Sequence, residues 1–302
     1  MPRTRPEVSI IIPAYQSERT IGRSLFTMQA QAFPDYEIVL VDSSPDDRTE
    51  EIVRTRFAEA RYEHSPHRLL PYAARNRGVE IARGRLLAFT DPDIYARPSW
   101  LQNLVAAYRK YGGAISGAIA CHGWRPLEIG MHFCKFDMWL PGGDVRRVEI
   151  GATANLLCDR AAFETAGGFD PESMLADTLM SWSLESKGIP IRFVPNALVE
   201  HHHLGTWGTL LRERYARGRE FAGLRLKREA WSDMRVLTQT LASLIPLRLA
   251  KLTLRGAGNA RRAKSLGRFL KVSPVVVSGQ AAWLAGEAAA YRAWLTRPRE
   301  TC

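Results

Sequence analysis

The sequence predicts an α/β fold, in which a mostly parallel sheet carries helices on both faces, followed by a basic helical region. Strand-like and helix-like runs alternate over the first 110 residues, which is typical of parallel strands joined by helical crossovers. The charge changes along the chain: residues 1–204 carry 23 Lys and Arg against 25 Asp and Glu, whereas residues 205–302 carry 19 against 6. We therefore expect an α/β domain at 1–204 and a basic, mostly helical region at 205–302.

The elements of the first part follow from apolar runs and from the residues that end them. Short apolar runs are typical of buried parallel strands, and Pro, Gly and capping residues mark the helix ends. The expected strands are Val8–Ile12, Glu37–Val41, Leu86–Thr90 and Ala114–Ala120. The expected helices are Ser17–Ala32, Asp46–Ala58, Pro71–Arg83 and Ser99–Tyr111.

Residues 121–150 are rich in Trp, Gly and charge, and they predict irregular loops. A second block of βα character follows over 151–195. It contains the expected helices Asp159–Ala166 and Asp177–Lys187, each ended by glycine, and the expected strands Ile191–Val194 and Pro195–Val199.

The last third predicts helices, beginning with the long basic stretch Thr206–Trp231. Val236–Leu247 and Val272–Gly286 carry no charge, but both are shorter than the roughly 20 residues that a membrane span needs. The basic residues that flank them favour helices lying at a membrane interface. Two alternatives are ordinary helices packed on the first domain and a shallow inserted hairpin.

Cysteine spacing and the N-terminus bear on the compartment. Cys121, Cys134, Cys158 and Cys302 form no C-x-x-C pair, which favours buried thiols of a reducing compartment. The apolar run after the N-terminus is a single strand that Pro13 interrupts, and it does not resemble a signal peptide. We expect a cytoplasmic location at the inner membrane face. The basic excess brings no recognised nucleic-acid reader motif, so no nucleic-acid partner is expected.

Asp91-Pro92-Asp93 directly follows the expected strand Leu86–Thr90. The proline favours an extended backbone, which can direct both carboxylates into one crevice at the carboxyl end of the sheet. Two carboxylates in a cleft suit Mg²⁺ or Mn²⁺, and such ions commonly complete their coordination on substrate phosphates. The alternative is a solvated turn. Two further strands support a site, because Asp42 ends one and Pro13-Ala14-Tyr15 ends another.

Several motifs together resemble the family 2 glycosyltransferases of GT-A fold, a Rossmann-like fold. They are Val8–Tyr15, Glu37–Asp42, Ala74-Arg-Asn-Arg-Gly78, Leu87–Asp93 and Gly167-Gly-Phe-Asp170 followed by Asp177. The resemblance covers residues 7–204 and keeps the order of the family. It implies a nucleotide-sugar transferase that uses Mn²⁺ or Mg²⁺.

The resemblance also implies a role for each matching residue. Pro13, Ala14 and Tyr15 match the loop around the nucleotide, and Asp42 matches the acid that accepts a hydrogen bond from the base, a contact suited to uracil. Arg75 matches the basic residue near the base and phosphates. Asp91 matches a contact with the ribose or, through water, with the metal. Asp93 matches the direct metal ligand.

Asp177 matches the general base that takes the proton from an acceptor hydroxyl, which inverts the configuration of the sugar. Its position at a helix start places the carboxylate near the positive end of the helix dipole, although the residue could simply cap the helix. Asn155 matches a position on the acceptor side or caps a turn. His201, in the run 201–203, is a candidate metal ligand or a polar loop residue.

The chain also departs from the family pattern. Ala176-Asp177-Thr178-Leu179 replaces Glu-Asp-x-Asp, and the Gln-x-x-Arg-Trp element of polymerising members is absent. These residues favour a single transfer from a UDP-sugar donor to a lipid-linked or envelope-glycan acceptor, with peripheral membrane contact through 205–302. The alternative is a nucleotide-sugar-binding protein that has lost catalysis.

Overall fold

A computed structural model describes residues 5–244 and 246–297; Cys302 and part of the predicted helix 236–247 lie outside them. The chain forms two compact units. The first comprises the residues up to His122 together with Trp139–His202, and the second comprises Gly123–Met138 and the residues from His203 onward. The expected boundary after residue 204 lies close to His203, where the chain enters the second unit for the last time. The segment Gly123–Met138 was expected to belong to the first domain, and it lies in the second unit instead.

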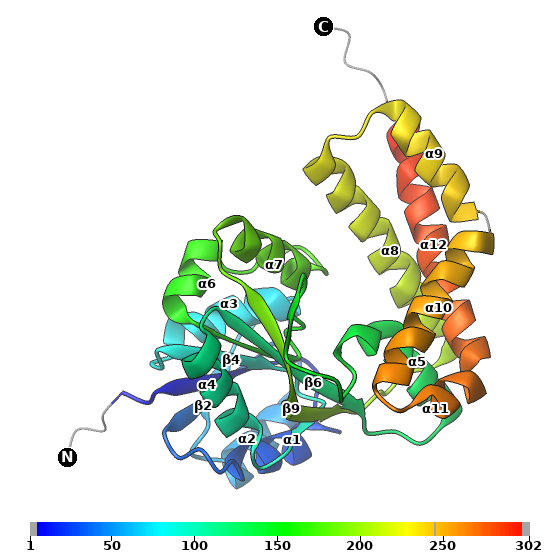
Figure 1. Ribbon diagram of the computed structural model, residues 1–302. Coiled ribbons are helices and arrows are strands. Elements are labelled where there is room, and N and C mark those ends of the chain that lie inside the picture. The colour runs from blue at the N-terminus through cyan, green and yellow to red at the C-terminus, as the bar shows by residue number, and fades with distance from the viewer. Residues whose placement is uncertain (1–4, 245, 298–302) are drawn as a thin grey trace, which may run out of the picture. The chain divides into compact units, whose positions relative to one another are not determined.

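The described residues of the first unit form a nine-stranded mixed sheet with the order β3-β2-β1-β4-β8-β6-β9-β5, and β7 pairs with β9 (Figure 1). The strands β1, β2, β3, β4, β6 and β9 run parallel to one another, whereas β5, β7 and β8 run antiparallel to their neighbours. The strands are β1 (Val8–Ala14), β2 (Tyr36–Asp42), β3 (Arg61–His64), β4 (Leu86–Thr90), β5 (Ile94–Ala96), β6 (Ala114–Cys121), β7 (Arg146–Val148), β8 (Asn155–Asp159) and β9 (Ile191–His201).

Helices cover both faces of this sheet, as the sequence predicts. Alternate strand residues such as Ile11, Val39 and Phe89 pack in one buried cluster with α3, α6 and α7. The helices α1 and α4 contact strands on the other face (Figure 1). The helices of this unit are α1 (Ile21–Gln29), α2 (Arg48–Arg56), α3 (Pro71–Ile81), α4 (Trp100–Tyr111), α6 (Arg160–Ala166) and α7 (Ala176–Ser186).

Strand β9 is continuous, whereas two strands were expected on either side of Pro195. Its pairing with β6 shifts between Gly117, opposite Val194, and Ala118, opposite Leu198. The residues 195–197 therefore form a bulge, which accommodates a proline that has no N–H to donate to the ladder. The continuous strand carries the chain through to His201, two residues beyond the expected end.

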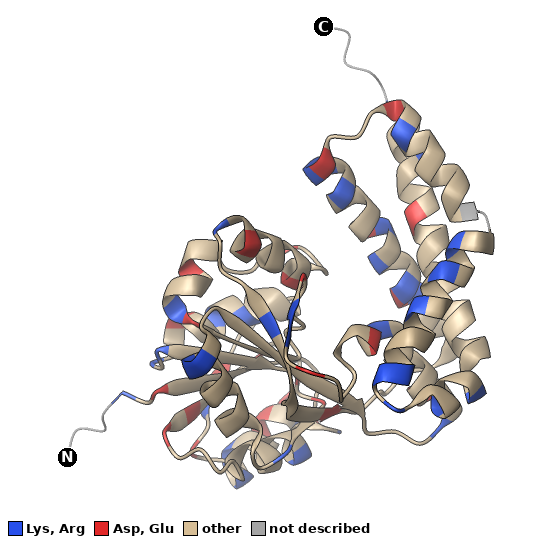
Figure 2. Ribbon diagram, viewed as in Figure 1, with Lys and Arg blue, Asp and Glu red and all other residues tan. Residues whose placement is uncertain are grey.

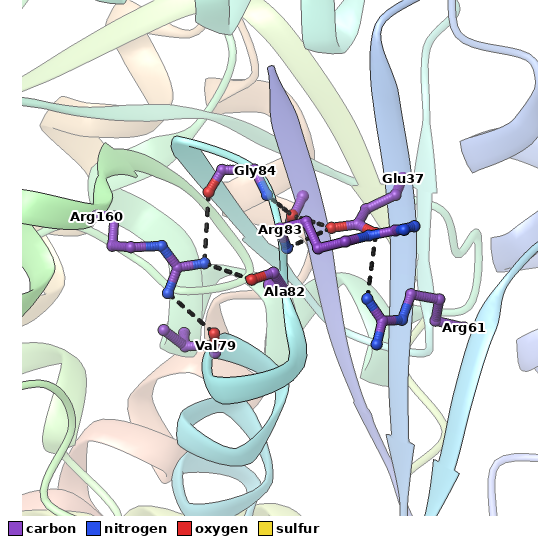
Figure 3. Close-up of polar contacts among 8 residues, drawn as sticks. Glu37, Arg61, Val79, Ala82, Arg83, Gly84 and Arg160 are labelled. Atoms are coloured by element: carbon purple, nitrogen blue, oxygen red, sulfur yellow. Dashed lines mark hydrogen bonds and ion pairs between the residues drawn. The ribbon is translucent and has the colours of Figure 1, made fainter. Parts of the chain in front are cut away.

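Side chains from α6, β1 and β2 hold the C-terminal end of α3 and the residues that follow it (Figure 3). The guanidinium of Arg160 donates to the carbonyl oxygens of Val79 at 3.0 Å and Ala82 at 2.7 Å. The carboxylate of Glu37 accepts from the backbone N–H of Arg83 at 2.6 Å and from the hydroxyl of Ser9 at 2.7 Å. The Arg160 guanidinium thus satisfies carbonyl groups that the C-terminal end of a helix leaves unpaired, and the Glu37 carboxylate holds the backbone just beyond the helix.

The second unit is helical. Its helices are α5 (Pro126–Phe136), α8 (Trp207–Glu229), α9 (Asp233–Leu244), α10 (Pro246–Arg262), α11 (Leu266–Lys271) and α12 (Ser273–Leu295). Helix α5 lies in the stretch that was expected to be irregular. Pro126 occupies its first turn, and the Glu128 carboxylate accepts from the N–H groups of Trp124 and Arg125, both at 3.2 Å.

Glycines allow close packing between α8 and α12. A Cβ atom at Gly218 would lie 2.2 Å from the carbonyl oxygen of Trp283, and one at Gly286 would lie 2.0 Å from that of Tyr215. The two backbones therefore approach too closely for any larger residue at either position. None of the described helices combines the length and apolar character that crossing a bilayer demands.

Candidate functional site

The candidate site residues gather where parallel strands end. Because β1, β2, β4 and β9 run in the same direction, their carboxyl ends lie along one edge of the sheet. Tyr15 follows β1, Asp42 is the last residue of β2, and Asp91 and Asp93 follow β4. His201 ends β9. The strand order thus explains why residues far apart in the sequence belong to one region.

Asp91, Asp93 and His201 form a possible metal site. Strand β5 pairs with β9 so that Ile94 lies opposite His201, and the backbone N–H of His202 donates to the carbonyl oxygen of Asp93 at 2.9 Å. One ligand atom from each of the three side chains lies within 4.8 Å of the other two. His201 Nε2 is 3.6 Å from Asp93 Oδ1. His201 is buried and belongs to a strand, so its expected place in a surface loop was wrong.

The donor set fits a small divalent cation. Two carboxylates and one imidazole suit Mn²⁺, and carboxylates alone also suit Mg²⁺. The site is half-buried, since Asp91 and Asp93 are partly accessible while His201 is covered. A bound substrate oxygen therefore has access to the two carboxylates.

Arg75 brings a buried positive charge to the same place. It lies on α3, is 3% exposed, and forms an ion pair with Asp91. The ring of Tyr72 lies 5.0 Å from the guanidinium. Among the described residues none accepts a hydrogen bond from the buried Nε of Arg75. A buried arginine with a donor to spare is suited to an anionic group such as a phosphate.

Asn76, which follows Arg75 on α3, links this helix to the turn between α6 and α7. The Asn76 amide donates to the Phe169 carbonyl at 2.7 Å and accepts from the Phe169 N–H at 3.1 Å. This turn needs glycine, because Gly167 and Gly168 have φ angles of 89° and 71°. No role was predicted for Asn76, although Asn76 belongs to the same Ala-Arg-Asn motif as Arg75.

Asp177 lies in the first turn of α7 and is not its N-cap, which is Leu175. The Asp177 carboxylate accepts from the N–H of Thr178 at 2.8 Å. The Ser181 hydroxyl donates to the Asp177 carbonyl at 2.6 Å and accepts from the N–H of Gly151 at 3.1 Å. Asp177 is therefore held at the positive end of the helix dipole and is partly accessible. Its role as a base stays a prediction.

The loops that follow β1 and β2 are linked by hydrogen bonds, but most of the residues expected around the nucleotide belong to the strands themselves. Pro13 and Ala14 are part of β1, so only Tyr15 lies beyond the strand. The N–H of Gln16 donates to the Ser44 hydroxyl at 2.7 Å, and the N–H of Ser43 donates to the Ala14 carbonyl at 3.1 Å. The guanidinium of Arg68 lies 4.5 Å from the centre of the Tyr15 ring. The backbone next to Tyr15 is therefore constrained. The guanidinium of Arg68, which was not predicted to belong to the site, lies over the Tyr15 ring.

Asp42 is completely buried. One carboxylate oxygen accepts from the N–H and hydroxyl of Ser44, at 2.9 and 2.6 Å, and the other accepts from the Tyr62 hydroxyl at 2.9 Å. Burial, and then the Asp42 charge, raise the pKa of Tyr62. Asp42 thus holds the loop after β2. A hydrogen bond to a base stays a prediction, and the base would have to reach the oxygen that Tyr62 contacts.

Asn155 does not line an acceptor cleft, and that prediction was wrong. Its side chain is fully buried. The amide nitrogen donates to the carbonyl oxygens of Ala118 and Ala197, both at 2.9 Å, and the amide oxygen accepts from the Trp100 indole at 2.8 Å. Asn155 therefore links β6, β9 and α4 inside the first unit.

A second group of side chains surrounds the strand that ends in His201. The Glu200 carboxylate pairs with His122 at 2.8 Å and with Arg97, and the Tyr95 hydroxyl lies 3.0 Å from His202 Nδ1. These contacts were not predicted from the sequence. The alternation of side chains along a strand could have predicted them, because it places Glu200 and His202 on the face opposite His201.

Comparison with protein families gives a match over residues 9–152, to the family described as Glycosyl transferase family 2. The chain is 26% identical over 230 residues to glycosyltransferase AglE of Haloferax volcanii, covering 72% of this chain and 74% of AglE. It is 32% identical over 185 residues to validoxylamine A glucosyltransferase of Streptomyces hygroscopicus subsp. jinggangensis. That match covers 59% of this chain and 43% of the relative. The chain thus spans less than half of that relative.

Two solved structures share the fold. One is the mannosyltransferase PcManGT from Pyrobaculum calidifontis in complex with GDP-Man and Mn²⁺, with a TM-score of 0.58 and 21% identity. It covers 98% of this chain, and 84% of PcManGT is matched. The other is GalNAc-T7 with UDP, GalNAc and Mn²⁺, with a TM-score of 0.53 and 18% identity over 67% of this chain and 44% of that one.

Proposed function

We propose that the chain, which matches the family 2 glycosyltransferases over residues 9–152 and shares the GT-A fold, transfers one sugar from a nucleotide-sugar donor to a hydroxyl acceptor. One observation supports this proposal above the others. Asp91, Asp93 and His201 converge at the carboxyl edge of the sheet, and the buried Arg75 pairs with the first of them. This combination offers a cation site and a fixed positive charge to a diphosphate.

In the proposed site, Asp93 and His201 hold the cation, with Asp91 beside them. A bound Mn²⁺ or Mg²⁺ supplies Lewis-acid neutralisation of the diphosphate charge. Arg75 stays fixed by Asp91 and donates its remaining N–H groups to phosphate oxygens. Both features stabilise a leaving group whose negative charge increases as the glycosidic bond breaks.

Asp177 is the proposed general base. An acceptor hydroxyl oxygen attacks the anomeric carbon, and its proton passes to the Asp177 carboxylate. The bond from that carbon to the diphosphate oxygen breaks, and the electron pair leaves with the nucleoside diphosphate. Attack from the side opposite the leaving group inverts the sugar configuration. Base assistance of this kind contributes roughly 10²–10⁴-fold to the rate.

The donor is proposed to be a UDP-sugar, because the buried Asp42 offers an acceptor oxygen of the kind that suits the N3–H of uracil. One solved relative in fold carries UDP and the other GDP-Man, so UDP and GDP are the two nucleotides to compare. The proposed acceptor is a lipid-linked or envelope-glycan precursor. Peripheral membrane contact through the basic residues 205–302, at the cytoplasmic face, is consistent with such an acceptor.

The test is transfer and donor hydrolysis with the wild type, Asp93→Ala and Asp177→Asn, with and without Mn²⁺. The proposal requires Asp93→Ala to lose metal-dependent donor binding. It requires Asp177→Asn to keep donor binding and lose roughly 10²-fold or more in transfer rate. Unchanged transfer in both variants would reject the assigned roles.

A second candidate is a nucleotide-sugar-binding protein without catalysis. Ala176 and Leu179, which flank Asp177 where the family pattern has acids, favour this candidate. Calorimetry distinguishes the two. Metal-dependent UDP binding with no turnover on any acceptor tested would support the second candidate and contradict the first.

A further inference from the structure

Large apolar side chains are exposed along two consecutive helices of the second unit. On α9, Met234, Leu237 and Leu241 follow the i, i+3, i+7 spacing of one helix face. On α10, Leu247 and Leu254 lie two turns apart. These five side chains are between 43% and 77% exposed. We call them, together with the exposed Lys251 between the two α10 leucines, the α9–α10 face.

The charge around this face is mostly basic, although Arg235, Arg248 and Arg255 pair with acids of neighbouring segments. The residues 234–286 contain nine Lys and Arg and no Asp or Glu. Six of the nine lie on α9 and α10, and Figure 2 shows basic positions recurring along α10. Lys251, Arg261 and Arg262 are exposed. An exposed row of leucines beside a surplus of cations is the composition of a helix that lies at a charged interface.

We propose that the α9–α10 face docks on an anionic lipid surface, with the leucines at the boundary of headgroups and acyl chains and the cations at the headgroups. Charge complementarity identifies this occupant. A second copy of the chain would bring like charges together. A nucleic acid would neutralise the cations but would leave the leucines in water, because phosphates offer them no apolar contact.

The proposal specifies the membrane contact suggested above and names its surface. It concerns binding alone and requires no sugar transfer. Its failure would therefore leave the proposed reaction intact, and failure of the reaction would leave this surface unaffected.

The experiment measures co-sedimentation of the full chain with phosphatidylcholine vesicles and with vesicles that also contain phosphatidylglycerol. We expect binding to the second kind that weakens as salt is added. Leu247→Glu with Leu254→Glu should weaken it at least about tenfold, because two apolar contacts are lost and two negative charges are gained. Lys251→Gln should weaken it about fivefold.

The matched control is Phe26→Glu, because Phe26 is 66% exposed on α1 of the first unit and carries the same kind of substitution. It should bind as the wild type does. Circular dichroism establishes that each variant is folded, which is expected because all the substituted side chains are exposed.

Three results would overturn the proposal. They are binding that the leucine substitutions do not change, equal binding to both kinds of vesicle, and binding of RNA or DNA with none of vesicles. Loss of vesicle binding in the variant that carries both Leu247→Glu and Leu254→Glu, with binding retained in Phe26→Glu, would support the proposal.

Discussion

At the residue scale, Asp91 and Asp93 have the same side chain but different surroundings. Asp91 pairs with Arg75, which is almost completely buried, whereas Asp93 lies beside His201 and is more exposed. Removing one partner of a buried ion pair leaves the other charge uncompensated, and this usually costs more than the pair itself contributes. The two aspartates should therefore respond differently to the same substitution.

We expect Asp91→Asn to lower the free energy of unfolding by roughly 2–3 kcal/mol, because Arg75 loses its counter-charge. Asp93→Asn should lower it by less than about 1 kcal/mol and should weaken Mn²⁺ binding at least about tenfold. Urea denaturation and metal titration measure the two effects. Equal destabilisation by both variants would contradict the assigned difference.

Single residues also differ in whether the local sequence determines their place in the fold. The sequence correctly predicted that Asp91 and Asp93 lie at the end of a buried strand, since that placement depends on local pattern alone. Asn155 matched a motif position, but its amide is saturated by Ala118, Ala197 and Trp100, which come from other parts of the chain. A motif specifies the residue type. Only the packing decides whether the side chain points into a cleft or into the core.

At the element scale, apolar patterning predicted β1, β2, β4, β6, β9 and most helices, but it did not predict the strands β3, β5, β7 and β8. Two further differences, in α5 and β9, have local causes. Helix α5 was hidden by its Trp-rich and Gly-rich surroundings, although Pro126 and Glu128 are start signals. Pro195 suggested a break between two strands, but β9 is continuous because a bulge opposite β6 accommodates the proline. Both corrections concern how an element tolerates or uses one residue.

The attachment of β2 to the end of α3 predicts a pH dependence. Burial raises the pKa of Glu37, but hydrogen bonds from Ser9 and Arg83 outweigh it, and the net pKa is lowered. The contribution of Glu37 to stability is thus fully present above the unfolded-state pKa of about 4.3 and is lost as pH falls through the lower folded-state pKa.

Glu37→Gln should therefore lower the free energy of unfolding by roughly 1–3 kcal/mol at pH 7, and the difference from the wild type should shrink on acidification below about pH 4. Denaturant unfolding over this range measures it. A difference that stays constant with pH would mean that the charge of Glu37 is not responsible.

Helix α8 provides a matched pair of glycines. A Cβ atom at Gly218 would collide with the Trp283 backbone, whereas nothing lies within 4 Å of a Cβ atom at Gly223. Gly218→Ala should destabilise the helical unit by about 1–3 kcal/mol through overpacking. Gly223→Ala should stabilise it by about 0.5–1 kcal/mol through helix propensity. Thermal unfolding followed by circular dichroism separates the two, and changes of the same sign would refute the close approach.

At the scale of the whole molecule, the change of charge near residue 204 predicted two parts, but it did not predict which segments of the chain each part contains. Helix α5 joins the second unit through contacts of Gly130 with Val275 and of Cys134 with Gly279. These partners are more than a hundred residues apart in the sequence. No local pattern carries such a contact, because it depends on the space that two glycines leave between helices.

Ligand binding should couple the site to the stability of the whole first unit. A ligand that binds only the folded state adds about 2.7 kcal/mol at one hundred times its Kd. We expect Mn²⁺ with UDP to raise the melting temperature of the wild type, and UDP alone to raise it much less, because in the proposed site Asp93 and His201 would hold a cation that neutralises the diphosphate. Asp93→Asn and His201→Ala should each remove most of the increase, whereas Phe26→Glu should keep it.

GDP with Mn²⁺ is the comparison that tests the base. A larger increase in melting temperature with GDP than with UDP would contradict the uracil assignment of Asp42 and leave the metal site intact. An increase that survives in both metal-site variants would place the nucleotide elsewhere on the chain.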